Sequence, residues 1–272
     1  MGVYVEESQI SNPQVSVIMP VYNSEKTIRY SIASVYAQSF KEWELIVIND
    51  CSNDKSCQVI KDMEATQSRI RLLSNESNKG VAYSRNKGIA VSRGTWLAFL
   101  DSDDLWRDDK LEKQVRLMKE RDAVISYTGT AYMDYDGREY SYKLKAKQKL
   151  PYNDLLKHNI MSCSSVMVRR DIMERISFAS GCLHEDYAAW LSIVNEAGHA
   201  YGLNEPLVVY RLSKESKSGK RFNSALMTYK AYRYVKFNPL TSFALTLRYA
   251  KYSITKRLSI RIGGFSLQGT NI

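Results

Sequence analysis

Short apolar segments alternate with segments of helical periodicity over the first hundred residues. Residues 15–21 and 43–50 are mostly apolar and β-branched, which is typical of strands covered on both faces. Between them, apolar side chains recur at helical spacing at Ile28, Ile32 and Val35. Ser24 is the expected N-cap of this helix. The pattern therefore predicts one strand–helix–strand unit at the start of the chain.

The alternation continues to about residue 100. It predicts a helix over residues 56–66, a strand over 70–74, a helix over 81–92 and a strand over 95–100. Alternating strands and helices predict an α/β fold with an open, mainly parallel central sheet and flanking helices. Ligands of such sheets bind at the carboxyl ends of the strands.

Polar residues follow three of the predicted strands directly, so this fold would collect them on one rim. Residues 20–23 follow the first strand, Asp50 ends the second, and residues 101–104 follow the strand over 95–100. Taken alone, Asp50 is as consistent with a turn or a helix cap as with a ligand site. Three independent rim positions together favour a ligand site.

Three aspartates, Asp101, Asp103 and Asp104, form an acidic cluster on this rim. Carboxylates this close repel one another, so they raise each other's pKa or hold a cation between them. Two carboxylates one residue apart coordinate Mg²⁺ or Mn²⁺ incompletely and leave positions for water and phosphate oxygens. The chain has no GxGxxG after the first strand and no GxxxxGKS/T motif. These patterns indicate a metal diphosphate held without a dinucleotide fingerprint or a P-loop.

The composition is that of an ordinary globular protein, with 44% hydrophobic and 25% charged residues among 272. This length fits one large domain with a smaller appendage. The cysteines form no CxxC pair and the histidines have no zinc spacing, so we expect reduced thiols in a cytosolic protein. The first residues lack a signal-peptide pattern, and no apolar run is long enough to span a bilayer.

The formal net charge of +10 is concentrated in the last quarter of the chain. From Leu207 onward there are thirteen Lys or Arg residues and a single acid, Glu215, whereas residues 1–206 carry 26 basic and 28 acidic residues. The chain therefore joins a nearly neutral body to a cationic region, and each needs its own functional explanation.

Four ordered motifs resemble those of the family-2 glycosyltransferases that synthesise bacterial surface polysaccharides of the teichuronic-acid, O-antigen and capsule types. The motifs are VSVIMPVYNSEKTIRYSIASVYAQSFKEWELIVINDCSNDKS, NKGVAYSRNKGIAVSRGTWLAFLDSDDLW, HEDYAAWL and YRLSKESKS. The likeness covers about residues 14–220 and implies a glycosyltransferase-A fold. The implied parts are an N-terminal extension (1–13), a catalytic domain (14–212) with a nucleotide-sugar half (14–106) and an acceptor half (107–212), and a basic helical C-terminal region (213–272).

The resemblance also implies a UDP-sugar as donor and assigns residues to its site. The residues that would border the nucleotide are Pro20, Tyr22, Asn23, Glu25, Gly80, Arg85 and Ser102. Asp50 would contact the base or ribose, Asp101 would contact the ribose, and Asp103 would bind Mg²⁺ or Mn²⁺. Asp104 would start the following turn, support the site from behind or act as a further ligand. Cys51 departs from the family pattern, because many members have glycine there.

Transfer of a sugar to a hydroxyl with inversion needs a carboxylate that takes the acceptor proton and a counter-charge for the departing diphosphate. By resemblance, Asp186 in HEDYAAWL is this base and Glu185 binds acceptor hydroxyls. Without the resemblance, the same motif is typical of an acidic helix start. The resemblance places Arg211 at the start of a segment that closes over the diphosphate, with Ser213, Lys214 and Ser216 as weaker candidates. An α-linked UDP-sugar would then give a β-linked product.

The acceptor side is expected between residues 125 and 190. The pattern over residues 163–172 predicts a strand and a helix beside the cleft, with Ser164 and Ser165 near the sugar. An ordinary buried strand is an equal alternative. The Asp-Gly pair at 136–137 predicts a hairpin, and residues 141–152 predict an exposed basic loop.

Apolar side chains in the cationic region recur at helical spacing at Leu240, Phe243, Leu247, Ala250 and Ile254. Arg248 and Lys251 lie among them, which predicts a basic amphipathic helix. Six tyrosines between Tyr210 and Tyr252 also fit nucleic-acid binding, and packing on the catalytic domain is a third alternative. Because acceptors of the resembled family are commonly lipid-linked, we expect this region to bind an anionic membrane surface rather than nucleic acid. The protein would then lie on the cytoplasmic face of the cell membrane.

Two other classes of protein compete with this interpretation. A phosphotransferase with Asp101 as nucleophile and Asp103 as acid would carry the pair after its first strand and would lack an upstream nucleotide pocket. A non-catalytic basic module that binds membrane or nucleotide explains the cationic region but leaves Asp50, Asp103 and Asp186 unexplained. We therefore expect an inverting, metal-dependent glycosyltransferase that acts on a lipid-linked or oligosaccharide acceptor.

Overall fold

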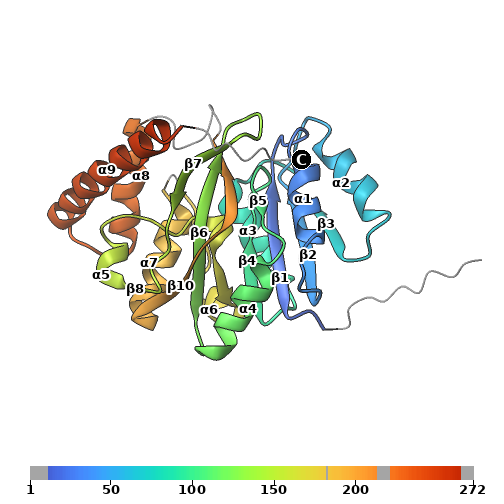
Figure 1. Cartoon of the computed structure of the whole chain (residues 1–272), viewed down its shortest axis with the longest axis horizontal. Coiled ribbons are helices and arrows are strands. Elements are labelled where there is room, and N and C mark those ends of the chain that lie inside the picture. The colour runs from blue at the N-terminus through green and yellow to red at the C-terminus, as the bar shows by residue number, and fades with distance from the viewer. Residues whose placement is uncertain (1–11, 182, 213–220, 265–272) are drawn as a thin grey trace, which may run out of the picture.

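The centre of the fold is one mixed sheet, seen in a computed structural model that describes residues 12–181, 183–212 and 221–264 (Figure 1). The strand order is β3-β2-β1-β4-β9-β6-β10-β5, with β7 paired to β6 and β8 paired to β10. β1 to β4 are mutually parallel, β10 is parallel to β6, and β9 runs antiparallel between β4 and β6. The strands are β1 (Val15–Val21), β2 (Trp43–Asn49), β3 (Ile70–Ser74), β4 (Trp96–Phe99), β5 (Leu105–Trp106), β6 (Ile125–Met133), β7 (Glu139–Leu144), β8 (Lys149–Pro151), β9 (Met167–Arg169) and β10 (His199–Arg211).

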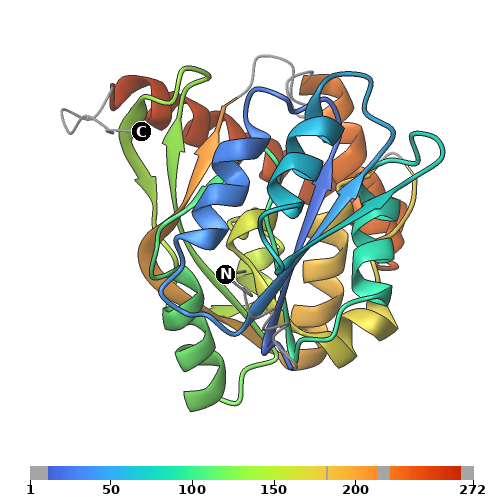
Figure 2. The ribbon, with the colours of Figure 1, turned by 90° about the vertical axis from the view of Figure 1, so that its right-hand side faces the viewer.

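Helices cover both faces of this sheet, which explains why its central strands are apolar throughout (Figure 2). In β1, Val17 and Met19 face the layer of α1 and α4, whereas Ile18 between them faces the layer of α3 and α7. The first layer contains α1 (Ile28–Tyr36), α2 (Ser56–Glu64) and α4 (Lys110–Glu120), and the second contains α3 (Val81–Ala90), α6 (Arg170–Ile176) and α7 (Glu185–Ala197). The short elements α5 (Tyr152–Leu155) and η1 (Cys163–Ser165) join these layers to the sheet. The predicted α/β fold with a mainly parallel sheet is confirmed.

Two further helices, α8 (Arg221–Tyr234) and α9 (Pro239–Ile262), form a helical hairpin beside β7 and α7 (Figure 1). α8 packs on α7, where the hydroxyl oxygens of Tyr187 and Tyr232 lie 3.0 Å apart. Asn238 caps α9 by accepting a hydrogen bond from the Thr241 N–H at 2.9 Å. The helix predicted from Pro239 onward is therefore confirmed. No helix within the described ranges is long and apolar enough to cross a membrane.

Three local predictions have different outcomes. The prediction of Ser24 as N-cap is wrong, because α1 begins at Ile28 and the backbone carbonyl of Ser24, rather than its hydroxyl, accepts the Ile28 N–H. The exposed loop predicted over 141–152 is also wrong, because most of this segment belongs to β7 and β8 and pairs with β6 and β10. The hairpin at 136–137 is confirmed: β6 and β7 are antiparallel, and Gly137 has a φ of +86°.

Candidate active site

The loops that follow β1 and β2 are fastened to each other at the carboxyl edge of the sheet. The Asn23 N–H donates to Ser52 Oγ at 3.1 Å, and its side-chain oxygen accepts the Asn53 N–H at 3.0 Å. Glu25 Oε2 accepts the Lys55 N–H at 3.0 Å. Asn23 and Glu25 therefore shape this edge through backbone contacts between the two loops.

The other residues predicted from the first motif lie at the same edge. Pro20 is buried within β1, whereas the ring of Tyr22 is exposed beyond its end. Cys51 has a φ of +60°, a conformation that glycine adopts without steric cost.

Asp50 is almost fully buried and accepts three hydrogen bonds from the loop that follows β3. The donors are Asn75 Nδ2 at 2.8 Å, the Lys79 N–H at 2.9 Å and the Gly80 N–H at 2.8 Å. Gly80 has a φ of +88° and immediately precedes α3. Asp50 and Gly80 are thus brought together, and Asp50 holds the backbone of Lys79 and Gly80 just before the start of α3.

The acidic cluster after β4 divides into carboxylates with different partners. Asp104 is fully buried; its Oδ2 accepts from Ser164 Oγ at 2.6 Å and its Oδ1 accepts the Arg211 N–H at 3.0 Å. Burial and the charges of Asp103 and Asp101 raise the pKa of Asp104 well above its usual value. Asp104 therefore ties the turn to η1 and β10, in keeping with a supporting role rather than a ligand role. On the other side of the turn, Ser102 Oγ lies 2.7 Å from Ser24 Oγ.

Arg85 connects the acidic turn to the start of α7. Its Nη2 lies 2.6 Å from Asp101 Oδ1, its Nη1 lies 3.0 Å from Glu185 Oε1, and the guanidinium is 4% exposed. The guanidinium carbon also lies 5.3 Å from the centre of the Phe178 ring. The resemblance assigns Arg85 to the border of the nucleotide, and this contact stays a prediction; the structure buries Arg85 between two carboxylates. This residue therefore sets the relative position of the two acidic groups.

Asp186 lies in the first turn of α7, next to Glu185. Burial and the charge of Glu185 raise the pKa of Asp186 to about 6. A carboxylate with this pKa binds a proton more tightly than an ordinary aspartate yet is mostly ionised at neutral pH, as a general base requires. His184, which precedes the helix, lies with Nε2 3.2 Å from Ser224 Oγ on α8 and so has a structural contact.

Arg211 ends β10 and is held against the acidic turn through backbone groups. Its Nε donates to the Asp103 carbonyl at 3.0 Å, and its Nη1 donates to the Tyr135 carbonyl at 2.9 Å. The guanidinium is thus next to the acidic turn, and its contact with the diphosphate stays a prediction. Ser213, Lys214 and Ser216 in the predicted closing segment lie outside the described residues.

The acidic turn suits a hard divalent cation. Burial and the charge of Asp101 raise the pKa of Asp103 to about 6, so a cation in place of the proton would relieve this repulsion. In the part of the chain that the structure describes, no three His, Cys, Asp or Glu side chains are grouped closely enough to hold a metal ion by themselves. The chain therefore offers Asp103, with Asp101 beside it, as a partial ligand set that water and phosphate oxygens would complete.

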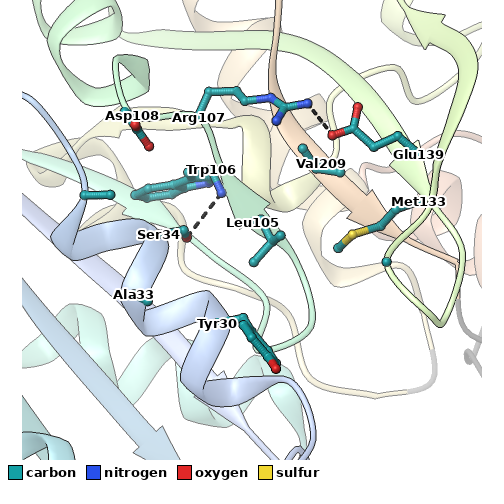
Figure 3. Close-up of a pocket in the computed structure, with 12 residues that line it drawn as sticks. Tyr30, Ala33, Ser34, Leu105, Trp106, Arg107, Asp108, Met133, Glu139 and Val209 are labelled. Atoms are coloured by element: carbon teal, nitrogen blue, oxygen red, sulfur yellow. Dashed lines mark hydrogen bonds and ion pairs between the residues drawn. The ribbon is translucent and has the colours of Figure 1, made fainter. Parts of the chain in front are cut away.

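Two adjoining cavities extend from Arg211 along α1. The first, of about 250 Å³, is lined by Lys26, Tyr30, Tyr135 and Arg211 among others. The second, of about 390 Å³, shares Tyr30, Leu105 and Gly137 with the first and continues to Trp106 (Figure 3). In the second cavity the Trp106 N–H donates to Ser34 Oγ at 3.2 Å, and Arg107 forms an ion pair with Glu139. Both halves of the catalytic body thus contribute walls beside the acidic turn.

Two residues that support the site were not assigned from the sequence, namely Asn75 and Ser164. Asn75 was missed, although it directly follows β3 just as Asp50 directly follows β2, so the same rule would have found it. Ser164 was left between two alternatives. Its hydroxyl accepts the Asp101 N–H at 3.1 Å and donates to Asp104, so it supports the acidic turn from the side of η1.

The sheet order and the two helical layers are those of the glycosyltransferase-A fold. The structure of S. aureus TarS in complex with UDP-GlcNAc matches with a TM-score of 0.70 at 18% identity, over 92% of this chain and 76% of that chain. The mannosyltransferase PcManGT from Pyrobaculum calidifontis, in complex with GDP-Man and Mn²⁺, matches with a TM-score of 0.68 at 17% identity, over 91% and 76%. These similarities confirm the predicted fold.

The chain belongs to glycosyl transferase family 2, whose model matches residues 16–177. It is 37% identical to TuaG of Bacillus subtilis, a glycosyltransferase with a proposed role in teichuronic acid biosynthesis, over 90% of this chain and 98% of that protein. It is also 37% identical to WfgD of Escherichia coli, a UDP-Glc:alpha-D-GlcNAc-diphosphoundecaprenol beta-1,3-glucosyltransferase, over 89% and 94%. The resemblance to glycosyltransferases of bacterial surface polysaccharides is confirmed.

Proposed function

We propose that the protein transfers a sugar from a UDP-sugar to a hydroxyl of a lipid-linked glycan, with inversion at the anomeric carbon and with a divalent cation. The observation that carries this proposal is the Asp101–Arg85–Glu185 network, which joins the acidic turn after β4 to the acidic start of α7. Asp103 follows one end of this network and Asp186 follows the other. The two carboxylate functions that the reaction needs therefore belong to one electrostatically connected site.

In this proposal Asp186 takes the proton of the acceptor hydroxyl while the oxygen of that hydroxyl attacks the anomeric carbon of the donor sugar. Glu185, fixed by Arg85, would orient the acceptor. Mg²⁺ or Mn²⁺ held by Asp103 would stabilise the negative charge that develops on the departing UDP. Arg211 lies beside the same turn and adds positive charge there. The direct displacement requires no covalent intermediate and gives a β-linked product from an α-linked donor.

The nucleotide pocket would be formed by the loops after β1, β2 and β3. Asn23, Glu25 and Asp50 hold these loops through the hydrogen bonds described above, and Tyr22 and Gly80 lie on them. Asp101 would contact the ribose, and Ser102 would border the same pocket. The cavities next to Arg211 are open to an acceptor from the side of α1 and β7.

The donor and acceptor classes are supported by named relatives. WfgD uses a UDP-linked sugar and an acceptor bound to undecaprenol diphosphate, as its name states, and TarS has been solved with UDP-GlcNAc. We propose the same donor and acceptor classes for this chain, together with a location on the cytoplasmic face of the cell membrane.

The turnover number should depend on the ionisation of Asp186. Its pKa of about 6 lies above the ordinary value, so the base is lost by protonation as the pH falls through 6. We expect kcat at saturating Mn²⁺ and donor to be constant above about pH 7 and to fall about tenfold per pH unit below pH 6. A kcat that is unchanged down to pH 4.5 would contradict this assignment of the base.

Calorimetric titration with UDP, with and without Mn²⁺, tests the donor site. We expect UDP binding that depends on Mn²⁺, and Asp103→Ala should weaken it at least about tenfold, or about 1.4 kcal/mol, because the metal ligand is lost. Asp62→Ala is the matched control, since this exposed carboxylate lies on α2 and lines neither cavity. If neither protein binds UDP under either condition, the site is not a UDP site and a non-catalytic binding module becomes the better account.

A further inference from the structure

The helix α9 packs Leu245, Tyr249 and Ile260 toward the body, and it also exposes many large apolar side chains. Ser242 is fully buried and Thr246 is 8% exposed on the side that faces the body. The exposed apolar side chains are Leu240 (84%), Phe243 (58%), Leu247 (58%), Ile254 (53%), Leu258 (52%) and Ile262 (83%). We call these six residues the apolar stripe.

The apolar stripe occupies a single face of α9. Its members are separated by three, four or seven residues, which at 100° per residue places them within a sector of about 100° that also contains Lys251. Ser242 and Thr246 lie on the opposite side of the same helix. The stripe runs from Leu240 to Ile262, so it extends along about 33 Å. A row of six exposed large apolar side chains on one face of a helix marks an interaction site.

The charge of the helical hairpin identifies the partner. Residues 221–262 contain nine Lys or Arg residues and no Asp or Glu. Arg248 and Lys251 are exposed on α9, and Lys230 and Arg233 are exposed on α8. Each basic residue near an anionic lipid surface adds to the attraction. A second copy of this hairpin would bring two cationic surfaces together, so self-association through the stripe is electrostatically opposed.

We propose that the apolar stripe of α9 lies in the interfacial layer of an anionic lipid bilayer, with its flanking basic side chains at the lipid headgroups. Apolar residues along one face with lysine and arginine beside them are typical of helices that lie in the membrane plane. Burial of the stripe among acyl chains supplies the hydrophobic free energy, and the basic residues supply the preference for anionic lipids.

This attachment has a consequence for the active site, and that consequence rests on the proposed function. α8 joins α9 to α7, because Tyr232 on α8 contacts Tyr187 on α7 and Ser224 contacts His184. Asp186 lies between these two contact residues on α7. Docking of α9 would therefore hold the base side of the site next to the bilayer that carries the lipid-linked acceptor.

Sedimentation of the full chain with lipid vesicles tests the proposal. We expect binding to vesicles of phosphatidylcholine with about one-third phosphatidylglycerol and at least tenfold weaker binding to phosphatidylcholine alone. The double variant Phe243→Ser/Leu247→Ser removes apolar area without a change of charge, and Arg248→Glu/Lys251→Glu removes charge from the same face. Each should lower the partition coefficient on anionic vesicles at least tenfold.

The matched control is Lys61→Glu/Arg116→Glu, which makes the same charge change at exposed positions of α2 and α4. It should bind anionic vesicles within about twofold of the original chain. Equal binding by all three variants, or a monomer–dimer shift that only the serine variant abolishes, would overturn the proposal in favour of nonspecific attraction or self-association. Circular dichroism confirms folding of each variant.

UDP calorimetry on the same proteins keeps the two proposals apart. The α9 variants should retain UDP binding, and Asp103→Ala should retain vesicle binding. If the α9 variants lose vesicle binding but keep UDP binding, the result supports the role of α9 and leaves the proposed function untouched. If the original chain binds vesicles but not UDP, the proposed function fails and the role of α9 stands.

Discussion

Asp186→Asn should lower kcat by about 10²- to 10⁴-fold while leaving the Kd for UDP within about twofold. The amide keeps the size of the side chain but cannot take a proton from the acceptor. The donor side of the site, at Asp103 and Asp50, is untouched by this change. Transfer is measured with radiolabelled donor and a glycan acceptor, and UDP binding is measured by calorimetry.

Asp171→Asn is the control for this experiment. Asp171 also lies in the first turn of a helix, α6, but it is exposed and pairs with Arg169 at the surface. This variant should retain full activity, since an exposed ion pair of this kind contributes little. An active Asp186→Asn enzyme would show that another group is the base.

The same Asp186 variant should also be more stable at pH 7.5. The folded-state pKa of Asp186 lies above the unfolded value, so the wild-type fold loses stability as the pH rises from about 4 through 6. Removal of this charge should raise the free energy of unfolding by about 1–2 kcal/mol at pH 7.5, because the side chain is partly exposed, and should give no gain at pH 4. The loss of kcat and the gain in stability would have one cause: the charge of Asp186 that the reaction needs destabilises the folded state.

Arg85→Met should destabilise the fold by about 3 kcal/mol and remove transfer activity, the largest stability effect that we expect of any change at the site. The methionine fills the space of the arginine stem but leaves Asp101 and Glu185 without their shared counter-charge. Both carboxylates would then repel one another across the site. Urea denaturation gives the free energy of unfolding.

Arg175→Met provides the comparison for Arg85. Arg175 pairs with Glu196 at 2.7 Å, but its side chain is 57% exposed. This change should leave the midpoint of urea unfolding nearly unchanged, because an exposed ion pair of this kind contributes little. If the two variants are equally stable, the buried network does not hold α3, β4 and α7 together in the way described.

The first half of the fold was predictable because its signals are local. The alternation of apolar periods fixes the order of elements from residue 15 to residue 100, and the rule that polar residues gather at strand ends leads to Asp50 and the acidic turn. The helix at Pro239 was predictable for the same reason. The start of α1 was not, because Ser24 uses its backbone carbonyl in a turn and its hydroxyl on Ser102, a residue 78 positions away.

The arrangement within the site could not be derived from local patterns. Arg85 contacts residues 16 and 100 positions further along the chain, and no periodicity reports such a contact. The split of the acidic turn into a buried Asp104 and an outward Asp103 depends on Ser164 and Arg211, which arrive from distant elements. Which face of α9 points outward likewise depends on how the helix packs on the rest of the protein. The amphipathic pattern alone therefore could not show whether the apolar face contacts the body or an external partner.

The two faces of α9 meet different physical requirements. Its inward face, with Leu245, Tyr249 and Ile260, secures the helix to the body, whereas its exposed outward side chains contribute little to folding. Substitutions among the outward residues can therefore accumulate without loss of the catalytic scaffold. Homologous enzymes in organisms with other lipid compositions could tune this face independently of the chemistry, and engineers could make it polar to obtain a protein that is easier to purify.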